Sequence, residues 1–488
     1  SAHYRYAGLG YAADVAKFIW LHRYIPSTTT IATHYLPDAF VGLAYREPLR
    51  SGDGRAGTWS TAADSVPAGL TISGGTIKGL PSETGIFSFE LFFTDRYGTT
   101  SSGIAYLTVR PQSHWTPRPL DSPGYPYATA GAVSCPAPAT CVITGAAYGN
   151  DDIGYATTHE FVTTLDTGST TIEYPAALQT TATTITEVGD IWCADAANCL
   201  ALADRHPYGD NLPKVQFRLR AAHLTGGAWS TTAITAPPGF TGLGLTSLWC
   251  ETLTSCIAVG SAWNNYDQPG DQPDAVPMVA SLVGTTWTVT TLALPAGMEV
   301  AVLSDIDCRS AANCVAVGFA SSASGNHVGF VATRSNGAWA SQILPVTSGD
   351  EGGEDLSGVS CPSSEVCIAV GIGDAADLLD DRPVVAKLVG GTWTKQVLVN
   401  ALPAGEQWPI VSVSCQTETS CVAVGNDWVW TSDGTTWVPS GAPSPLDGSA
   451  PWLYGLDCPS STSCIATGFF TFYGTDTYRP LIENFVAG

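Results

Sequence analysis

The chain has 488 residues, of which only 13% are charged, and its 43 acidic residues against 20 lysines and arginines give a formal net charge of −23. Nucleic acid is excluded as an expected partner, because its binding depends on a basic surface that neutralises phosphates. No apolar run approaches the roughly 18 residues of a membrane-spanning helix, so we expect no membrane span.

Residues 1–30 form an apolar, basic segment that belongs to neither of the domains predicted below. The segment contains three basic residues and one acidic residue, Asp14, so it has a net positive charge on an acidic chain. It is too apolar for a free solvated tail. Two placements are open: packing on its own neighbouring domain, or docking on a second copy, which joins molecules head to tail into a filament. The residues expected at such an assembly contact are Tyr4, Arg5, Tyr6, Phe18, Trp20, Arg23 and Tyr24.

Residues 31–111 predict a small β-sandwich. FSFELFF (87–93) and IAYLTV (104–109) read as strands, and Pro-Gly turn signals separate them from their neighbours. Pro-Ala-Gly-Leu-x-Ile (67–72), Gly-x-Ile-x-Gly-x-Pro (75–81) and a Thr-Asp pair resemble the immunoglobulin-like, cadherin-like domains of bacterial surface proteins. The resemblance implies a spacer or adhesive module. Members of that family often bind calcium at domain junctions, although this chain shows no complete calcium site.

Residues 112–488 carry a Cys-x5-Cys motif seven times, as in VSCPSSEVCIAVG (359–371). An even number of cysteines at one paired spacing predicts local disulfides and an oxidising compartment outside the cytoplasm. Structural zinc fits less well, because zinc needs four ligands, each pair offers two, and no histidine recurs beside them. The predicted disulfides join Cys135 to Cys141, Cys193 to Cys199, Cys250 to Cys256, Cys308 to Cys314, Cys361 to Cys367, Cys415 to Cys421, and Cys458 to Cys464.

The repeat predicts an all-β fold with a seven-bladed β-propeller of four strands per blade. A period near fifty residues with strand-rich units is typical of propellers. The seventh unit ends where every earlier unit begins its fourth strand. Upstream of the first unit, SHWTPRPL (113–120) matches the fourth-strand pattern, with Trp115 in the place of Trp393. We therefore predict that this N-terminal strand completes the last blade and closes the ring.

Cys-x5-Cys followed by Ile/Val-Ala-Val-Gly, with a Gly-Thr-Thr-Trp hairpin further on, resembles the propeller repeats of secreted bacterial proteins. The resemblance implies a secreted or cell-surface protein of bacterial origin. The absence of an Asn-x-Ser/Thr acceptor fits that origin. The resemblance implies no particular chemistry, because propellers support many unrelated functions.

The sequence contains no recognised catalytic motif, such as G-x-S-x-G or H-E-x-x-H. We therefore expect a protein that is not an enzyme and needs no cofactor, although a hydrolase built from loop carboxylates stays open. TSDGTTW (431–437) is similar to the Asp-box turn of sialidase propellers but lacks one residue of that pattern. We predict instead a hairpin turn in which Asp433 bonds to its own backbone.

One face of the propeller is the expected binding surface. In a four-stranded blade the second-to-third and fourth-to-first loops share a face, and these loops are long and rich in carboxylates. Either a solvated acidic surface or a site for calcium or a cationic partner explains them. The weak metal candidates are Asp267, Asp271, Asp274, Asp377, Asp380 and Asp381. Five tryptophans outside the repeated fourth-strand position lie in or near predicted loops or a short strand and are candidates for contacts with a glycan or a protein partner: Trp263, Trp408, Trp428, Trp430 and Trp452.

These patterns lead to two functional hypotheses. The first is an extracellular structural or adhesive protein, the subunit of a surface assembly or filament joined through its N-terminal segment. The alternative is a carbohydrate-binding or carbohydrate-active propeller that uses the loop face. The expected partners are accordingly a second copy of the chain, another surface protein or a glycan.

Overall fold

The structure is a computed structural model of the chain. It describes residues 30–486 apart from 37–38, 43, 63–64, 111–114, 122–124, 139, 151–155, 167–169, 171, 180–183, 208–218, 265–274, 326, 346–352, 375–380, 399–407, 446–447 and 473–476. The chain divides between Arg110 and Pro111 into two compact units, a sandwich of two β-sheets and a propeller. Each unit is described by itself.

The first unit packs two sheets face to face, as the sequence predicts. One sheet has the order β1-β7-β6-β3 and the other the order β2-β5-β4. The long hairpin of the first sheet turns at Asp95, whose carboxylate accepts hydrogen bonds from the backbone N–H groups of Thr99 and Tyr97. These hydrogen bonds lower the pKa of Asp95 below its usual value. The strands are β1 (Ala39–Phe40), β2 (Tyr45–Pro48), β3 (Gly57–Thr61), β4 (Leu70–Ser73), β5 (Thr76–Gly79), β6 (Gly85–Asp95) and β7 (Thr100–Arg110).

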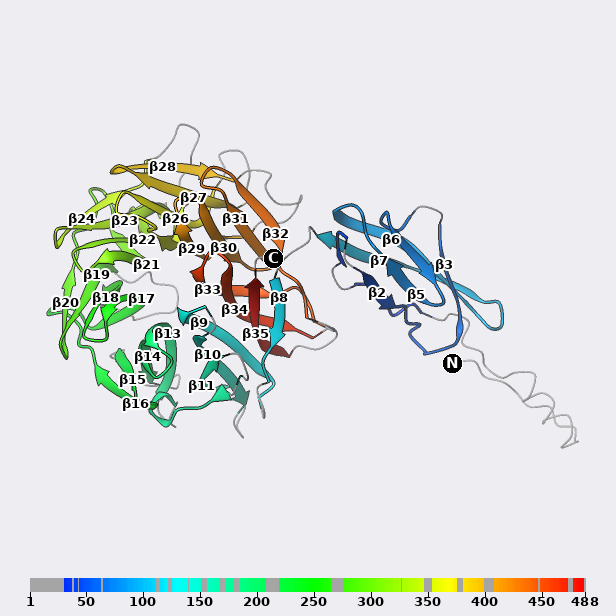
Figure 1. Ribbon diagram of the computed structural model, residues 1–488, viewed down its shortest axis with the longest axis horizontal. Coiled ribbons are helices and arrows are strands. Elements are labelled where there is room, and N and C mark those ends of the chain that lie inside the picture. Colours follow the sequence, from blue (N-terminus) through cyan, green and yellow to red (C-terminus); the bar gives the residue numbers. More distant parts are fainter. Residues whose placement is uncertain are drawn as a thin grey trace, which may run out of the picture. The chain divides into compact units, whose positions relative to one another are not determined.

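The second unit is a seven-bladed propeller over the part of the chain that the structure describes. Figure 1 shows the blades arranged around a central axis, with the first strand of each blade innermost. The first strands of blades 1 to 7 are β9 (Tyr127–Ala137), β13 (Thr184–Asp195), β17 (Gly242–Thr252), β21 (Val300–Ser310), β25 (Asp355–Ser360), β29 (Ser412–Thr417) and β33 (Trp452–Ser460). The second strands are β10 (Thr140–Asn150), β14 (Asn198–Pro207), β18 (Ser255–Trp263), β22 (Asn313–Ser321), β26 (Val366–Asp374), β30 (Ser420–Gly425) and β34 (Ser463–Thr471).

The outer strands complete each blade by antiparallel pairing. The third strands are β11 (Ala156–Leu165), β15 (Arg220–Thr225), β19 (Val276–Val283), β23 (His327–Ser335), β27 (Asp381–Val389), β31 (Trp428–Ser432) and β35 (Tyr478–Val486). The fourth strands of blades 1 to 6 are β12 (Ile172–Glu173), β16 (Ala228–Ala233), β20 (Thr286–Thr291), β24 (Ala338–Ile343), β28 (Thr392–Val397) and β32 (Trp437–Gly441). A short 3₁₀ helix, Ala176–Leu178, follows β12.

The predicted ring closure is confirmed. Strand β8 (Trp115–Pro119) pairs antiparallel with β35 and so supplies the fourth strand of blade 7. Trp115 lies opposite Phe485, and Trp393 lies opposite Leu388 at the same place in blade 5. Because the two ends of the propeller share one blade, neither end leaves an unpaired edge there.

The hydrophobic core lies between neighbouring blades. One buried cluster, for example, joins Val317 and Val331 of blade 4 to Ala369, Ala386 and other residues of blade 5. The structure joins the two cysteines of each repeat in a disulfide, and none of the fourteen cysteines is free. Each disulfide spans the turn between the first two strands of its blade. Disulfides persist in oxidising compartments, so these seven fit an extracellular protein.

Candidate functional site

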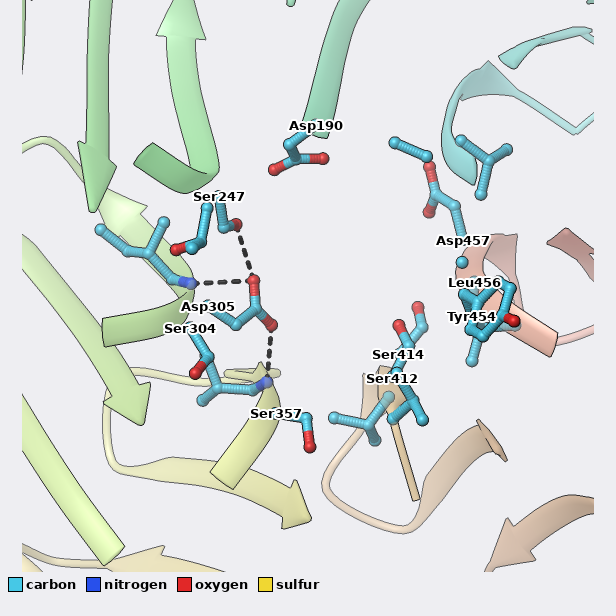
Figure 2. Close-up of a pocket in the computed structure, with 18 of the residues that line it drawn as sticks. Asp190, Ser247, Ser304, Asp305, Ser357, Ser412, Ser414, Tyr454, Leu456 and Asp457 are labelled. Atoms are coloured by element: carbon cyan, nitrogen blue, oxygen red, sulfur yellow. Dashed lines mark hydrogen bonds between the residues drawn. The ribbon is translucent and has the colours of Figure 1, made fainter. Parts of the chain in front are cut away.

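The innermost strands enclose a polar cavity of about 440 Å³ on the axis of the propeller. Figure 2 shows hydroxyl and carboxyl groups from several blades around this space, including Ser304, Ser412, Asp190 and Asp457. β-Bulges in the first strands supply part of the wall, because a bulged residue has no direct partner in the neighbouring strand. The bulged residues at the wall include Gly189, Thr246, Ser304, Ser357 and Tyr454.

The carboxylates of the cavity link neighbouring blades. Asp305 of blade 4 accepts hydrogen bonds from the Ser247 hydroxyl of blade 3 at 2.7 Å and from the Val359 backbone N–H of blade 5 at 2.7 Å (Figure 2). Asp190 of blade 2 accepts from the Leu248 backbone N–H of blade 3 at 2.7 Å. These side chains therefore accept hydrogen bonds from backbone N–H groups on the first strand of the neighbouring blade.

A second set of links between blades comes from the residue that precedes the first cysteine of a repeat. The carboxylate of Asp457 accepts from the backbone N–H of Cys135 at 2.7 Å and thus joins blade 7 to blade 1. Asp307 accepts from the N–H of Cys361 at 2.6 Å, and the Ser360 hydroxyl accepts from the N–H of Cys415 at 3.0 Å. The acids around the axis are thus engaged in holding the ring together.

Burial around the axis raises the pKa of these acids. The pKa reaches about 7 for Asp190 and Asp307 and about 6 for Asp457, because the enclosing blades remove water from the charged form. The nearby carboxylate of Asp305 raises the pKa of Asp190 and Asp307 further. Backbone N–H donors oppose the rise in each case.

The raised pKa values predict that the propeller becomes less stable as pH rises between about 5 and 8. The folded state favours the protonated acids, so their stabilising contribution is complete below the unfolded pKa of about 3.9 and is lost as pH passes the folded pKa. Acids with lowered pKa values, such as Asp433, lose their contribution only at lower pH. Calorimetric melting across this range measures the slope, and Asp307→Asn should flatten it. A midpoint that rises with pH in this window contradicts the prediction.

A line of aromatic rings lies on the face that carries the second-to-third and fourth-to-first loops. Trp408 contacts Trp452 with ring centroids 5.9 Å apart, and Trp452 stacks on Phe469 at 5.9 Å and 15°. Phe469 contacts Tyr478 at 5.1 Å, and Tyr478 contacts Tyr127 at 5.0 Å. Tyr454 adjoins Phe469, and Tyr148 adjoins Tyr478. We name this set the aromatic platform: Tyr127, Tyr148, Trp408, Trp452, Tyr454, Phe469 and Tyr478.

Three rings of the platform are open to solvent. Trp408 is 36% exposed, Trp452 41% and Tyr454 37%. Tyr454 also belongs to the wall of the axial cavity, so the platform and the cavity adjoin at this residue (Figure 2). Burial raises the pKa of Tyr454 and Tyr478 above the usual value, which keeps both phenols neutral.

The five tryptophans that the sequence singles out fall into three groups. Trp408 and Trp452 belong to the platform. Trp263 is half-buried at the end of β18, where its ring packs so closely on Gly242 that a Cβ there would lie 2.3 Å from the indole nitrogen. Trp428 and Trp430 are only 5% and 1% exposed and pack between blades 5 and 6. This burial corrects the expectation for Trp428 and Trp430, because neither side chain is accessible to a ligand.

The other five rings of the platform were not predicted, although aligning the repeats on their cysteines gives a signal. Blade 7 departs from the repeat by placing aromatic residues where most other blades have small or polar ones. At the position of Trp452 the other repeats have Thr129, Glu187, Gly244, Val302, Asp355 and Pro409. At the position of Phe469 they have Ala146, Asp204, Ser261, Phe319, Ile372 and Asn426.

Most of the predicted acidic surface lies outside the described residues. This holds for Asp267, Asp271, Asp274, Asp377 and Asp380 and for the side chain of Asp381. Among the residues that are described, Asp355 pairs with His327 at 2.9 Å, and Glu354 is buried in an ion pair with Lys395. No group of three or more His, Cys, Asp or Glu in this described part is arranged to hold a metal ion.

Of the remaining predictions, one is confirmed and one concerns residues that the structure does not describe. The turn at 431–437 is confirmed, because the Asp433 carboxylate accepts from the backbone N–H groups of Thr435 and Thr436 at 2.9 and 2.8 Å. The N-terminal residues proposed for assembly lie outside the described residues: Tyr4, Arg5, Tyr6, Phe18, Trp20, Arg23 and Tyr24. Within the described chain, no helix is long and apolar enough to span a membrane.

Comparison with solved structures finds proteins that are similar to this chain at low sequence identity and low TM-score. YCF48 from Cyanidioschyzon merolae is 13% identical, with 76% of this chain and 98% of that chain covered and a TM-score of 0.42. The β-propeller domain of the Trilobed protease from Pyrococcus furiosus is 9% identical, with 73% and 95% covered and a TM-score of 0.40. The Trypanosoma rangeli sialidase in complex with sialic acid is 9% identical, with 70% and 57% covered and a TM-score of 0.40. Matches at this level say nothing about ligand or activity.

Comparison of the sequence with known families and proteins informs only the first unit. No curated protein matches the chain. Residues 27–110 match the family model described as "Putative Ig domain". This match agrees with the two packed sheets of the first unit and identifies that part of the chain as an immunoglobulin-like domain.

Proposed function

We propose that this chain is an extracellular adhesive protein whose aromatic platform is its binding surface. The observation that carries the proposal is the exposure of Trp408, Trp452 and Tyr454, at 36% to 41%, within one continuous group of seven rings. Clustered exposed apolar side chains mark interaction sites. Tryptophan and tyrosine are also the residues that contribute most to binding energy at such sites.

The support beneath the platform favours binding. Trp452 lies opposite Phe469 in the β33–β34 pair, and the disulfide between Cys458 and Cys464 joins the same two strands. Each exposed ring also contacts another ring of the platform. The rings are therefore held in place before a partner arrives, so little side-chain entropy is lost on binding.

The test compares adhesion of the wild-type protein and the double variant Trp408→Ala/Trp452→Ala. We expect fluorescently labelled wild type to be retained on washed cells and extracellular matrix of the producing organism, and the variant to lose at least about tenfold in affinity. Tyr97→Ala is the control, because Tyr97 is 56% exposed but lies in the immunoglobulin-like unit. Equal retention of the double variant and the wild type refutes the proposal.

Self-association is the second candidate function, and an exposed face of the first unit favours it. The outer face of the sheet β1-β7-β6-β3 carries Ile86, Ile104 and Tyr106 at 51%, 50% and 41% exposure, with Tyr35 at 71% stacked on Tyr106. Glu90 lies opposite Ile104 on the neighbouring strand. We propose that residues 1–30 of a second copy cover this face, with apolar side chains on the apolar patch and basic side chains near Glu90.

Deleting residues 1–28 should then abolish self-association. We expect the intact protein to form ordered polymers, visible by light scattering and electron microscopy, and the truncated protein to remain monomeric. Tyr35→Ala/Tyr106→Ala should weaken assembly in the same way while residues 1–28 stay in place. A truncated protein that polymerises like the intact one, or an intact protein that stays monomeric, contradicts this candidate.

A further inference from the structure

The aromatic platform and the polar cavity adjoin at one residue. A ligand bound there must contact both aromatic rings and polar groups. Tyr454 contacts Phe469 of the platform and at the same time forms part of the cavity wall. It is the bulged residue of β33, and the corresponding bulged residues of blades 2 to 5 are Gly189, Thr246, Ser304 and Ser357. Only blade 7, among these five bulges, therefore presents a ring at the cavity wall.

The ligand must match apolar rings and polar groups that lie next to each other. On one side of Tyr454 lie the aromatic rings of the platform, with Trp452 and Trp408 the most accessible. On the other side the wall carries hydroxyl groups, such as those of Ser412 and Ser414 (Figure 2). A sugar ring has both features, because its C–H faces stack on aromatic rings and its hydroxyl groups donate and accept hydrogen bonds.

The charges favour a neutral ligand. None of the seven platform residues carries a positive charge, and the chain as a whole has a formal net charge of −23. The carboxylates of Asp190 and Asp457 also line the cavity. An anionic glycan or a nucleic acid would meet repulsion and find no basic side chain of the platform to pair with.

The arrangement of the rings favours a chain of sugars over a single sugar. From Trp408 through Trp452, Phe469 and Tyr478 to Tyr127, successive ring centroids lie 5.0 to 5.9 Å apart. The series begins before blade 6, crosses blade 7 and ends on blade 1. Several stacking positions in series give a longer ligand more contacts without any change in the protein.

We propose that the aromatic platform binds a neutral polysaccharide, which lies across blade 7 with one sugar at Tyr454 over the mouth of the axial cavity. This inference rests on the proposed adhesive function and specifies its ligand. Binding is by stacking on Trp408 and Trp452, with hydrogen bonds from the ligand hydroxyl groups to the Tyr454 phenol and the adjoining serines. No bond of the ligand is broken.

The first experiment treats the adhesion target and leaves the protein unchanged. Washed cells and matrix are exposed either to periodate, which cleaves the vicinal diols of sugars, or to protease, and are then washed and offered to the wild-type protein. We expect periodate to abolish retention and protease to leave most of it. Retention that survives periodate but not protease identifies a protein partner. That result overturns the glycan assignment, while a platform variant that loses adhesion still supports the adhesive function.

The second experiment measures binding directly by tryptophan fluorescence and calorimetry. The probes are cellohexaose, xylohexaose, mannohexaose, maltohexaose and chitohexaose, each compared with its disaccharide. We expect at least one hexaose to bind and to bind at least about tenfold more tightly than its disaccharide, because it contacts more rings. The absence of binding by all five hexaoses, or equal affinity for a hexaose and its disaccharide, overturns the proposal.

Variants assign the binding to the platform. Trp452→Ala should weaken binding of the hexaose about tenfold or more. Tyr454→Phe, which keeps the ring and removes only the hydroxyl group, should weaken it by a smaller factor and report on the contact at the cavity mouth. Tyr97→Ala and Val438→Ala, two exposed positions away from the platform, should leave affinity unchanged. If Trp452→Ala binds like the wild type while its melting temperature is unchanged, the platform is not the site.

Discussion

Replacing Trp115 by alanine is expected to lower the free energy of unfolding of the propeller by about 3–5 kcal/mol. The indole of Trp115 is 6% exposed and packs between blades 6 and 7, where its ring contacts Phe485 with centroids 5.2 Å apart. The substitution leaves a cavity in this cluster and weakens the attachment of β8. Because β8 is held to blade 7 only by contacts far apart in the sequence, its detachment exposes the edge of β35. Denaturant unfolding and hydrogen exchange of the β35 amides measure the two effects separately.

Trp393→Ala is the matched control for ring closure. Trp393 occupies the same fourth-strand place in blade 5 and is 5% exposed, but the chain reaches it directly from the third strand of the same blade. We expect a comparable loss of stability and no change in the exchange of the β35 amides. If Trp115→Ala and Trp393→Ala leave exchange in β35 equally slow, the pairing of β8 with β35 does not keep the ring closed.

Replacing Lys395 by methionine is expected to cost about 3–5 kcal/mol of stability, because it leaves the carboxylate of Glu354 buried without its counterion. The side chains of Lys395 and Glu354 are each 2% exposed and form an ion pair at the interface of blades 4 and 5. Glu354 also accepts a hydrogen bond from the backbone N–H of Gly329 in blade 4, at 3.2 Å. Thermal and denaturant unfolding give the change in free energy.

A double variant and a second lysine make this test specific. Lys395→Met/Glu354→Leu removes both charges and should recover most of the loss, because apolar residues of similar volume replace a buried pair well. Lys387→Met is the control: Lys387 lies on the adjacent strand β27 and donates to the carbonyl of Gly434, so its loss should cost less, about 1.5–3 kcal/mol. If Lys395→Met costs no more than Lys387→Met, the buried pair is unimportant for stability.

The fold could be predicted because the same Cys-x5-Cys repeat occurs seven times in the sequence. The cysteines mark the turn between the first two strands of each blade, and the hairpin tryptophans mark the start of the fourth strand. The missing fourth strand of the last repeat and the matching segment at Trp115 then determine ring closure. Each of these signals depends on short-range chemistry and a constant spacing, which a single sequence displays directly.

The site was predicted less well, because it depends on which residues of different blades meet. Trp430 occupies a place where four other blades have alanines (Ala222, Ala280, Ala332 and Ala386), and at that register position its side chain is enclosed between blades 5 and 6. Its residue type suggested a surface contact, but strand register decides burial. The contact of Tyr478 with Tyr127 joins the last blade to the first, across 351 residues of sequence. Local patterns carry no information about such a pair.

Hydroxyl-radical footprinting of the wild-type protein on its adhesion target shows whether the aromatic platform is the binding surface. The rates of side-chain oxidation are compared between free protein and protein retained on washed cells or matrix, without any substitution. We expect Trp408, Trp452 and Tyr454 to become protected on binding, while Tyr97, which is 56% exposed in the other unit, is oxidised at the same rate in both states. Retained protein in which these three platform residues are oxidised as fast as in free protein would show that the platform is not the binding surface.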